Sequence, residues 1–510
     1  MRIYSGNIYL NGEHHTAVAL DETGILALDD AALALGESED LGDRFLTHAF
    51  MDGHAHPLFA GREHLGPQVT NAQTVAEIQD IVAHWLAANP TPHWAVGGAY
   101  DRSIVEGGRF LASWLDEVAP DRPVVLHGSD HHTLWANSAA MRAAGVIDSA
   151  PPVSDGSIDT NPSGRPSGVF RETEAKELIT SVIPVLSIED ELRALDWAQN
   201  QMTKFGIAAV QDAWMDRGMV EVHLEAAKRN QLRVRTNLAF WAQPGQWLQA
   251  SGLFESQRAE IRALGHPKLS AETVKFFADG VFGSATASVK SEYESEPGNF
   301  GKPVWSAAEL CNAVSHFAAL GYQIHIHGIG DAGVAAALDA IAYAGVPKNS
   351  VIAHTELVDL ADIPRFQELD VVANFEPLWA REDGMLTSCV HHLGRERIDS
   401  MYRMRDFLSA GARISFGSDW PVSSPDPLLG IFTATHRALP ETPDKSWTPE
   451  QAVTIAEALD AYTTAVSRQL SLETSAADLV ILSGSPFSEP ILDLVVLETI
   501  IGGQTEFTRQ

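Results

Sequence analysis

Eight short apolar segments, each of the length of a buried strand, recur along most of this chain, and they constrain its fold more than any other feature. Segments with helical periodicity, such as AGVAAALDAIAYAG and MYRMRDFLSAG, lie between several of them. Parallel strands need crossover connections, and eight such strands with helices between them close into a barrel. The sequence therefore predicts an α/β fold whose main domain is a (β/α)8 TIM barrel. In chain order, the segments are FMDGHAH, GIAAVQDAW, RVRTNLAF, TVKFFADG, YQIHIHGIGD, SVIAHTE, DVVANFEP and RISFGSDWP.

The two ends of the chain resemble each other and differ from the middle. Both contain short strand-like pieces, and the first includes a turn at Asn11–Gly12. We predict a small β-sandwich domain built from residues 1–48 and 468–510, and a barrel domain over residues 49–467. The first two strand segments lie much further apart than one crossover requires, which predicts an inserted lid or subdomain at about residues 60–170. Within it, the polar segment Pro151–Gly168 is predicted to be a loop.

Composition excludes several classes of protein. The two cysteines among 510 residues cannot make a disulfide framework, so we expect a reducing, cytoplasmic location. The N-terminus does not resemble a signal peptide, and no run of 18 apolar residues predicts a membrane span. The formal charge of -32 disfavours nucleic acid and anionic membrane surfaces as partners, which leaves a small molecule. A homodimer is compatible with the sequence, which does not determine the oligomeric state.

Histidines at alternate positions in the first strand segment are the first candidate metal ligands. His54 and His56 project to the same side of a strand, about 7 Å apart by the strand rise, which suits one ion. Such a pair also occurs on exposed strand faces without a metal. Here Phe50 and Met51 precede the pair and Pro57 follows it, and in this apolar setting imidazoles need partners.

Three further candidates end other strand segments. His327 is preferred over His325 because it lies nearer the carboxyl end of its strand, where barrel enzymes hold their reacting groups. His325 then packs inside the barrel or supports a ligand. His354 is a candidate ligand or a hydrogen-bonded core imidazole, and Asp419 is a candidate ligand or a helix cap. Each residue could have a structural role by itself, but a shared site explains better than coincidence why all of them lie at the ends of strands.

Taken together, these motifs resemble the amidohydrolase superfamily, in the branch that includes YtcJ-like proteins and N-substituted formamide deformylases. The resemblance covers nearly the whole chain, through MDGHAHPLFAG, DHHTLWANSAAM, SGVFRETEA, VKFFADGVFGSATA, IHGIGDAGV, IAHTE and FGSDWPVSSPDP. It implies a metal centre with histidines on the first, fifth and sixth strands, a lysine on the fourth and an aspartate on the eighth. In this chain those positions are His54, His56, Lys275, His327, His354 and Asp419.

The resemblance also implies the chemistry of the lysine. Carbon dioxide converts a lysine amine into an anionic carbamate that bridges two cations, and such a carbamate on Lys275 would imply two metal ions. The alternative is that Lys275 pairs with Asp279 or another carboxylate, in which case one ion is more natural. Zinc is the expected divalent metal, because its ligands here are imidazoles and a carboxylate.

The expected activity is hydrolysis of a non-peptide C–N bond in an amide, formamide or N-acyl compound. A metal-activated water attacks the carbonyl, and Asp419 takes the proton of that water and passes it to the leaving nitrogen. A deaminase or a cyclic amidase would use the same site. The alternative of another class is a non-catalytic, metal-binding regulatory protein, although such a protein is expected to have lost a ligand and this chain keeps all of them.

Substrate contacts are predicted from the segment DHHTLWAN. The family pattern there is D-G-H-x-x-W-x-N-S, and this chain has His131 in place of the usual glycine. His132 is predicted to stabilise an oxyanion or contact the substrate, with loop packing as the alternative. Tryptophans near strand ends, including Trp214, are candidates for an apolar pocket, although tryptophan is more often a core residue. The residues assigned to substrate binding are Asp130, Trp135, Asn137 and Trp379.

Overall fold

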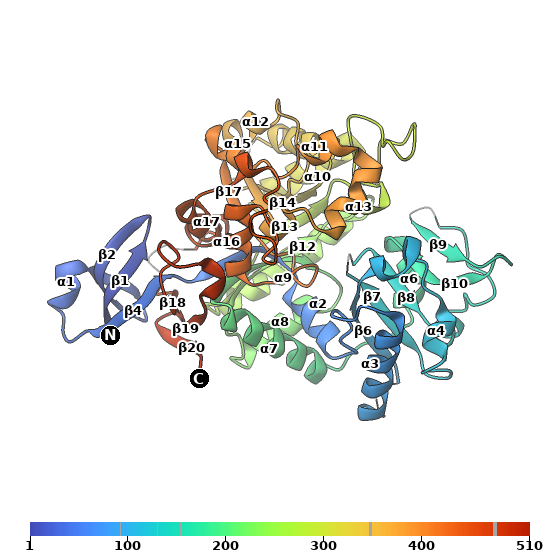
Figure 1. Cartoon of the computed structure of the whole chain (residues 1–510), viewed down its shortest axis with the longest axis horizontal. Coiled ribbons are helices and arrows are strands. Elements are labelled where there is room, and N and C mark those ends of the chain that lie inside the picture. The colour runs from blue at the N-terminus through green and yellow to red at the C-terminus, as the bar shows by residue number, and fades with distance from the viewer. Residues whose placement is uncertain (92, 130, 154–155, 346–348, 473–476) are drawn as a thin grey trace. The chain divides into compact units, whose positions relative to one another are not determined.

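The computed structural model describes residues 1–510 except residues 92, 130, 154–155, 346–348 and 473–476. The chain forms two compact units (Figure 1). The first contains Met1–His56 and Gln199–Gln510, and the second contains Pro57–Ala198. The first unit holds the barrel and a sheet made from both chain ends, and the second is inserted after the first barrel strand. Among the described residues, no helix has both the length and the apolar character that a membrane crossing requires.

An eight-stranded sheet forms the barrel, and every neighbouring pair in it is parallel. Each of the eight predicted segments contributes one strand, so the predicted barrel is confirmed. In spatial order the strands are β5 (Phe50–Ala55), β11 (Ile207–Met215), β12 (Arg235–Trp241), β13 (Leu269–Phe277), β14 (Gln323–Gly328), β15 (Val351–His354), β16 (Val372–Phe375) and β17 (Arg413–Phe416).

The first and last strands of this order meet through the loop after β17. The Asp419 amide donates to the His54 carbonyl at 2.8 Å, and the His56 amide donates to the Trp420 carbonyl at 2.7 Å. Helices α17 (Ile455–Tyr462) and α18 (Thr464–Gln469) pack against both β5 and β17. The seam of the barrel therefore places Asp419 beside His54 of β5 and beside His56, which lies just after that strand.

The helices between the strands carry apolar residues that pack on the sheet or on neighbouring helices. For example, α10 packs against α9, α11 and β14, and α15 packs against β17. The main helices of this layer are α7 (Ile188–Lys204), α8 (Met219–Lys228), α9 (Trp247–Leu264), α10 (Ala307–Ala319), α11 (Asp331–Tyr343), α12 (Ile363–Glu368), α13 (Gly384–Leu393), α15 (Met404–Ser409) and α16 (Pro427–His436).

A buried polar network connects neighbouring strands inside the barrel. Asn237 donates to both Gln211 and Thr273 at 2.7 Å, and the Thr273 hydroxyl donates to Gln323 at 2.6 Å. These side chains come from β11, β12, β13 and β14, so each bond links two adjacent strands. Buried polar groups of this kind are stable only when their hydrogen bonds are made, and here those bonds hold the strands in register.

The predicted β domain from both chain ends is confirmed, and its strands form one continuous hydrogen-bonded sheet. Apolar residues of both ends, including Tyr4, Leu20, Leu46 and Ile481, share one buried cluster. The strands, in spatial order, are β20 (Gln504–Thr508), β19 (Val496–Ile501), β18 (Leu479–Leu482), β4 (Glu39–His48), β1 (Arg2–Leu10), β2 (Glu13–Asp21) and β3 (Gly24–Leu28).

The second unit has its own five-stranded sheet and its own core. Tyr100, Phe110 and Trp135 are fully buried at the centre of that core. The segment Pro151–Gly168 is not only a loop, because the hairpin of β9 and β10 lies partly within it, around a turn in which the Asn161 carboxamide accepts backbone bonds. The sheet contains β6 (Ala95–Tyr100), β7 (Val124–Gly128), β8 (Thr133–Ala136), β10 (Pro166–Arg171) and β9 (Ser157–Thr160), and the longer helices are α2 (Pro57–His64), α3 (Val75–Ala88) and α6 (Thr173–Thr180).

Candidate metal centre

The residues predicted as metal ligands all lie at or near the carboxyl ends of barrel strands. Lys275 belongs to β13 and His327 to β14, His354 ends β15, and Asp419 lies in the loop after β17. All of them are buried, with exposed fractions from 0% for Lys275 to 8% for Asp419. The closed sheet therefore brings residues that are far apart in the chain to one end of the barrel.

Three of the predicted ligands converge on one point. Asp419 Oδ1 lies 2.9 Å from His56 Nε2 and 3.5 Å from His54 Nε2. All three ligand atoms lie within 4.8 Å of one another. Two imidazole nitrogens and a carboxylate oxygen in this arrangement are a donor set that fits zinc or a similar divalent ion.

Both His54 and His56 can present a lone pair to such an ion. Burial lowers the pKa of His54 well below its ordinary value, and the nearby Lys275 lowers it further. Burial also lowers the pKa of His56, against the opposing effect of Asp419. Since a metal-binding imidazole must be neutral, both rings are in the required form at neutral pH.

His354 and His327 form a second group beside the first. The ring of His354 lies 4.7 Å from that of His54 and 4.5 Å from that of His327. His327 Nε2 lies 3.1 Å from the Gly280 carbonyl oxygen and 3.7 Å from Asp279 Oδ1. The structure thus brings His327 and His354 together, next to the three ligands that already converge.

Lys275 is completely buried and lies between aromatic and imidazole rings. Its Nζ is 3.4 Å from His54 Nε2 and 4.9 Å from the centre of the Phe277 ring. Burial lowers the pKa of Lys275 to about 7, although Asp419 and Glu376 oppose the shift. An amine with this pKa is partly uncharged at neutral pH, which is the form that reacts with carbon dioxide.

Asp279, the alternative partner of Lys275, has different neighbours. Its carboxylate accepts bonds from the backbone amides of Ser288 at 2.8 Å, Ile329 at 3.1 Å and Gly330 at 2.9 Å. These bonds connect the loops that follow β13 and β14. Asp279 therefore orders the backbone around the site.

Two buried groups orient the imidazoles of the site: Glu376, which the sequence analysis did not assign, and His325, which it predicted either to pack inside the barrel or to support a ligand. The carboxylate of Glu376 accepts from His354 Nδ1 at 3.0 Å, which leaves Nε2 of His354 as the nitrogen for a metal. His325 Nε2 lies 2.9 Å from His54 Nδ1, so Nε2 of His54 is directed toward Asp419. Glu376 directly follows its strand, and this position alone marks it as a candidate.

The backbone around the ligands is held in uncommon conformations. His354 has a φ of 75°, Thr355 of 42° and Asp419 of 51°, where residues other than glycine rarely lie. Asp52 secures this region, because its carboxylate accepts from the amides of His54 and Ser418 at 3.1 and 3.0 Å. Such strain persists only where the surrounding structure compensates for it, and it is concentrated at functional sites.

Half-buried aromatic rings surround the ligands. Trp214 lies 6.3 Å from His56 and contacts Trp241 and Phe277 at 5.0 and 5.3 Å between ring centres. Trp379, which was predicted to contact substrate, stacks on His354 at 5.6 Å with an angle of 7° between the rings. The candidate metal centre therefore has apolar surroundings that are still partly exposed.

Comparison with known proteins identifies the family of this chain. A family model described as "Amidohydrolase family" matches residues 37–507. The chain belongs to the amidohydrolase family. It is thus a hydrolase by family, and it is similar over most of its length to curated members of the predicted branch.

The chain is also similar to "Protein LONG AFTER FAR-RED 3" of Arabidopsis thaliana, with 29% identity over 91% of this chain and 82% of the relative. "Putative amidohydrolase YtcJ" of Bacillus subtilis is 25% identical over 93% of this chain and 91% of the relative. "N-substituted formamide deformylase" of Arthrobacter pascens is 24% identical over 94% and 91%. The solved structure of an uncharacterized metal-dependent hydrolase from Pyrococcus horikoshii has the same fold, with a TM-score of 0.78 at 21% identity over 96% of this chain and 99% of that one.

The other predicted substrate residues of this amidohydrolase belong to the second unit. His132 Nδ1 lies 2.8 Å from a Glu172 carboxylate oxygen, and the His132 side chain is 31% exposed. Trp135 is fully buried in the core and donates to the Leu111 carbonyl at 3.1 Å. Asp130 lies outside the described residues.

Asn137 is also fully buried in the second unit. Its Oδ1 accepts from the amides of Val124 and Ala140 at 3.0 and 2.9 Å, which caps the short helix after β8. In the described structure Trp135 and Asn137 thus act in core packing and helix capping. Their contact with substrate, like that of His132, stays a prediction.

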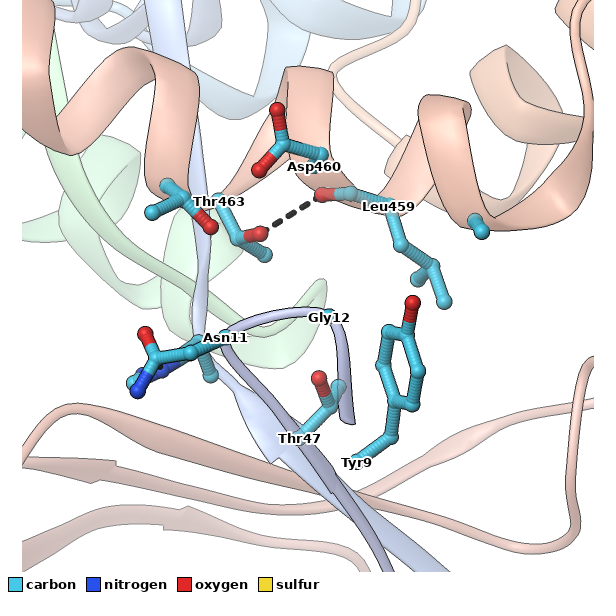
Figure 2. A pocket seen from close by; sticks show the side chains of 10 residues that line it. Tyr9, Asn11, Gly12, Thr47, Leu459, Asp460 and Thr463 are labelled. Carbon is cyan, nitrogen blue, oxygen red and sulfur yellow. Dashed lines mark hydrogen bonds between the residues drawn. The ribbon is translucent and has the colours of Figure 1, made fainter. Parts of the chain in front are cut away.

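A small pocket of this amidohydrolase lies at the other end of β5 (Figure 2). Tyr9, Asn11, Thr47 and Asp460 are among its lining residues, and the Thr463 hydroxyl beside them donates to the Leu459 carbonyl at 2.6 Å. Thr47 precedes the amino end of β5, whereas the predicted metal ligands lie at or near the carboxyl ends of the strands. In barrel enzymes the amino end serves stability rather than catalysis.

Proposed function

We propose that this amidohydrolase cleaves a non-peptide C–N bond in a small amide, formamide or N-acyl compound. The observation that carries the proposal is the convergence of His54 Nε2, His56 Nε2 and Asp419 Oδ1 within 4.8 Å at the carboxyl end of the barrel. The name of one similar protein, N-substituted formamide deformylase, supports the choice of bond.

Zinc is the proposed metal, in one or two ions. His54, His56 and Asp419 supply the nitrogens and the oxygen for the first ion. Lys275, if carboxylated, together with His327 and His354 supplies ligands for a second. A bound ion of this kind provides a water of lowered pKa and polarises the substrate carbonyl.

Asp419 is the proposed acceptor and donor of the proton. Burial raises the pKa of this carboxyl, but the hydrogen bond and charge of His56, together with the charges of His354 and Lys275, outweigh it and lower the pKa below its ordinary value. The carboxylate is therefore ionised at neutral pH and accepts a proton from the attacking water. As the tetrahedral intermediate collapses, Asp419 donates that proton to the leaving nitrogen.

The aromatic rings around the centre support a substrate with an apolar substituent. Trp214, Trp241 and Phe277 contact one another, and Trp379 stacks on His354. Flat apolar surfaces of this kind favour an aryl or alkyl group, while the polar groups of the centre receive the amide.

The direct test is a hydrolysis assay on the zinc-loaded chain with N-substituted formamides, N-acyl amines and cyclic amides. We expect release of the amine together with the carboxylate product. Asp419→Asn should retain much of its metal through the histidine ligands and lose the activity, because a carboxamide cannot accept the proton.

Asp426→Asn is the matched control. Asp426 lies further along the loop after β17, and its carboxylate accepts from the Leu428 amide at 2.9 Å as the cap of α16. Asparagine caps helices as well as aspartate does, so this variant should hydrolyse normally. Full activity of Asp419→Asn, or no turnover of any of these compound classes, would contradict the proposal.

A further inference from the structure

A second group of metal-ligating side chains lies entirely within the second unit. Glu63 belongs to α2, His127 to β7, and His131 to the loop that follows β7. Their ligand atoms all lie within 4.8 Å of one another. Glu63 Oε1 is 3.4 Å from His131 Nδ1, and the rings of His127 and His131 face each other at 6.0 Å. We call these three residues the Glu63–His127–His131 cluster.

The cluster is largely shielded from water but remains accessible to a small ion. The side chains of Glu63 and His131 are 12% and 23% exposed. Gly98 of β6 makes room for it, because a Cβ there would lie 3.0 Å from Glu63 Oε1 and 3.3 Å from the His127 Cβ. A close backbone approach of this kind fixes the carboxylate against the strand.

The backbone at His131 is unfavourable for a histidine. Its φ is 53°, in the left-handed region that glycine adopts readily and side-chain-bearing residues rarely do. This conformation places the His131 ring beside Glu63. A conformational cost at this position is consistent with a function of the imidazole.

Burial shifts the pKa values of two members of the cluster. Burial raises the pKa of Glu63 to about 8, because the ionised carboxylate is poorly solvated there. Burial, with a smaller effect of Lys176, lowers the pKa of His127 to about 4, so the imidazole keeps its lone pair. Lys176 is itself held by the His131 carbonyl at 2.5 Å. A divalent ion would supply the positive charge that a buried carboxylate requires.

We propose that the Glu63–His127–His131 cluster binds a divalent transition-metal ion, with Zn²⁺ as the representative. Two imidazole nitrogens and one carboxylate oxygen form the protein part of the ligand set, which zinc commonly accepts. The ion joins α2, β7 and the following loop, so its binding stabilises the second unit. This site uses none of the ligands of the barrel centre, and it does not depend on the proposed hydrolysis.

The test uses the full chain with His54→Ala and His56→Ala, which disables the barrel centre. After chelator treatment, this protein is dialysed against Zn²⁺ at pH 7.5, and bound zinc and Tm are measured. We expect about one ion at this cluster and a Tm that rises with Zn²⁺. Adding His131→Gly should weaken that binding ~10- to 100-fold and abolish the rise in Tm, since one ligand is lost.

His131→Gly is a favourable variant because glycine suits the φ of 53° at this position, so the backbone needs no change. Glu63→Gln preserves shape and should have the same effect on zinc binding. His84→Gln, on the exposed face of α3, removes an imidazole outside the cluster and should change nothing.

Two results would overturn the proposal. One is that the variant with His54→Ala and His56→Ala binds no zinc, and the other is that His131→Gly and Glu63→Gln leave its zinc binding unchanged. If the double variant does not fold, the zinc content of the unsubstituted chain is compared with that of His131→Gly. A loss of one ion supports the site, and equal contents refute it.

Discussion

Removal of the Glu376 carboxylate should weaken metal binding without touching a ligand atom. Glu376 is completely buried and accepts from His354 Nδ1 at 3.0 Å. Burial lowers the pKa of His354, but the charge and hydrogen bond of Glu376 outweigh it and raise that pKa. The carboxylate thus fixes the orientation of the ring and makes its other nitrogen a stronger donor.

The size of the effect follows from the type of bond. A hydrogen bond to a buried charged group contributes about 1.5–3 kcal/mol, equivalent to roughly 10- to 150-fold in an equilibrium constant. Glu376→Ala should therefore weaken zinc binding by about that factor. Glu376→Gln keeps a neutral acceptor and should lose only about 2- to 10-fold, since a neutral bond contributes about 0.5–1.5 kcal/mol.

Zinc affinity is measured by competition with a chromophoric chelator, and the Tm of the metal-free proteins is recorded in parallel. Glu356→Gln is the matched control, because Glu356 is a buried carboxyl near the same strand end that interacts with the charge of His354 but forms its side-chain hydrogen bond with Tyr402. Affinities of Glu376→Ala and Glu376→Gln equal to that of the unsubstituted chain would refute the reasoning. So would a loss in Glu356→Gln as large as that in Glu376→Ala.

Three other perturbations have defined outcomes. A Cβ on Gly417 would lie 2.8 Å from the His54 amide nitrogen. Gly417→Ala should therefore displace β5, lower the free energy of unfolding by about 1–3 kcal/mol and weaken metal binding. Gly252→Ala, whose Cβ would meet open space, should have none of these effects. Burial lowers the pKa of His48 to about 4. Between pH 6.5 and 4 the unfolded chain therefore binds more protons than the folded chain, and the free energy of unfolding falls as the pH drops through this window. In urea unfolding, the free energy of unfolding of His48→Gln should lack this pH-dependent component, which is roughly 3 kcal/mol at most at 1.36 kcal/mol per pKa unit. The same pH dependence in His48→Gln and in the unsubstituted chain would contradict the assignment. Thr454 caps α17 at the barrel seam, because its hydroxyl accepts from the Glu457 amide at 3.2 Å. Thr454→Ala should therefore lower the free energy of unfolding by ~1 kcal/mol, and Thr454→Ser should retain most of the stability.

The barrel could be predicted from the sequence because its signals are local. Each strand is an apolar run that ends in a polar loop, and the candidate ligands lie at those ends. His54, His327 and Asp419 share this position in three different segments. In a closed parallel barrel all such ends meet, so the sequence pattern predicts a common site without knowledge of the contacts.

Contacts across the barrel could not be predicted in the same way. His325 and His54 lie on β14 and β5, which are not neighbours in the sheet, and they meet only because the sheet closes. The bond between Glu376 and His354 likewise depends on the register of β15 and β16. Such pairs have no sequence periodicity.

The inserted unit was the least predictable part. The sequence alone does not show whether Trp135 lines a pocket or belongs to the core. In the structure its ring packs against Tyr100 and Phe110 in the core. The polar composition of Pro151–Gly168 predicts a loop, yet polar residues also form the two-stranded hairpin at this edge. Hairpins on a sheet edge need little apolar sequence, because one face of the ribbon remains in solvent.

Metal content is the measurement that tests the central claim most directly. The chain is purified without chelator or added metal and analysed for its elements beside the variant with His54→Ala and His56→Ala. Because these histidines supply two of the three converging ligand atoms, the account predicts zinc in the unsubstituted chain and a loss of the barrel ion in the variant. An unsubstituted chain that binds no zinc, manganese or iron even after reconstitution with bicarbonate, or a variant with undiminished metal, would contradict the account.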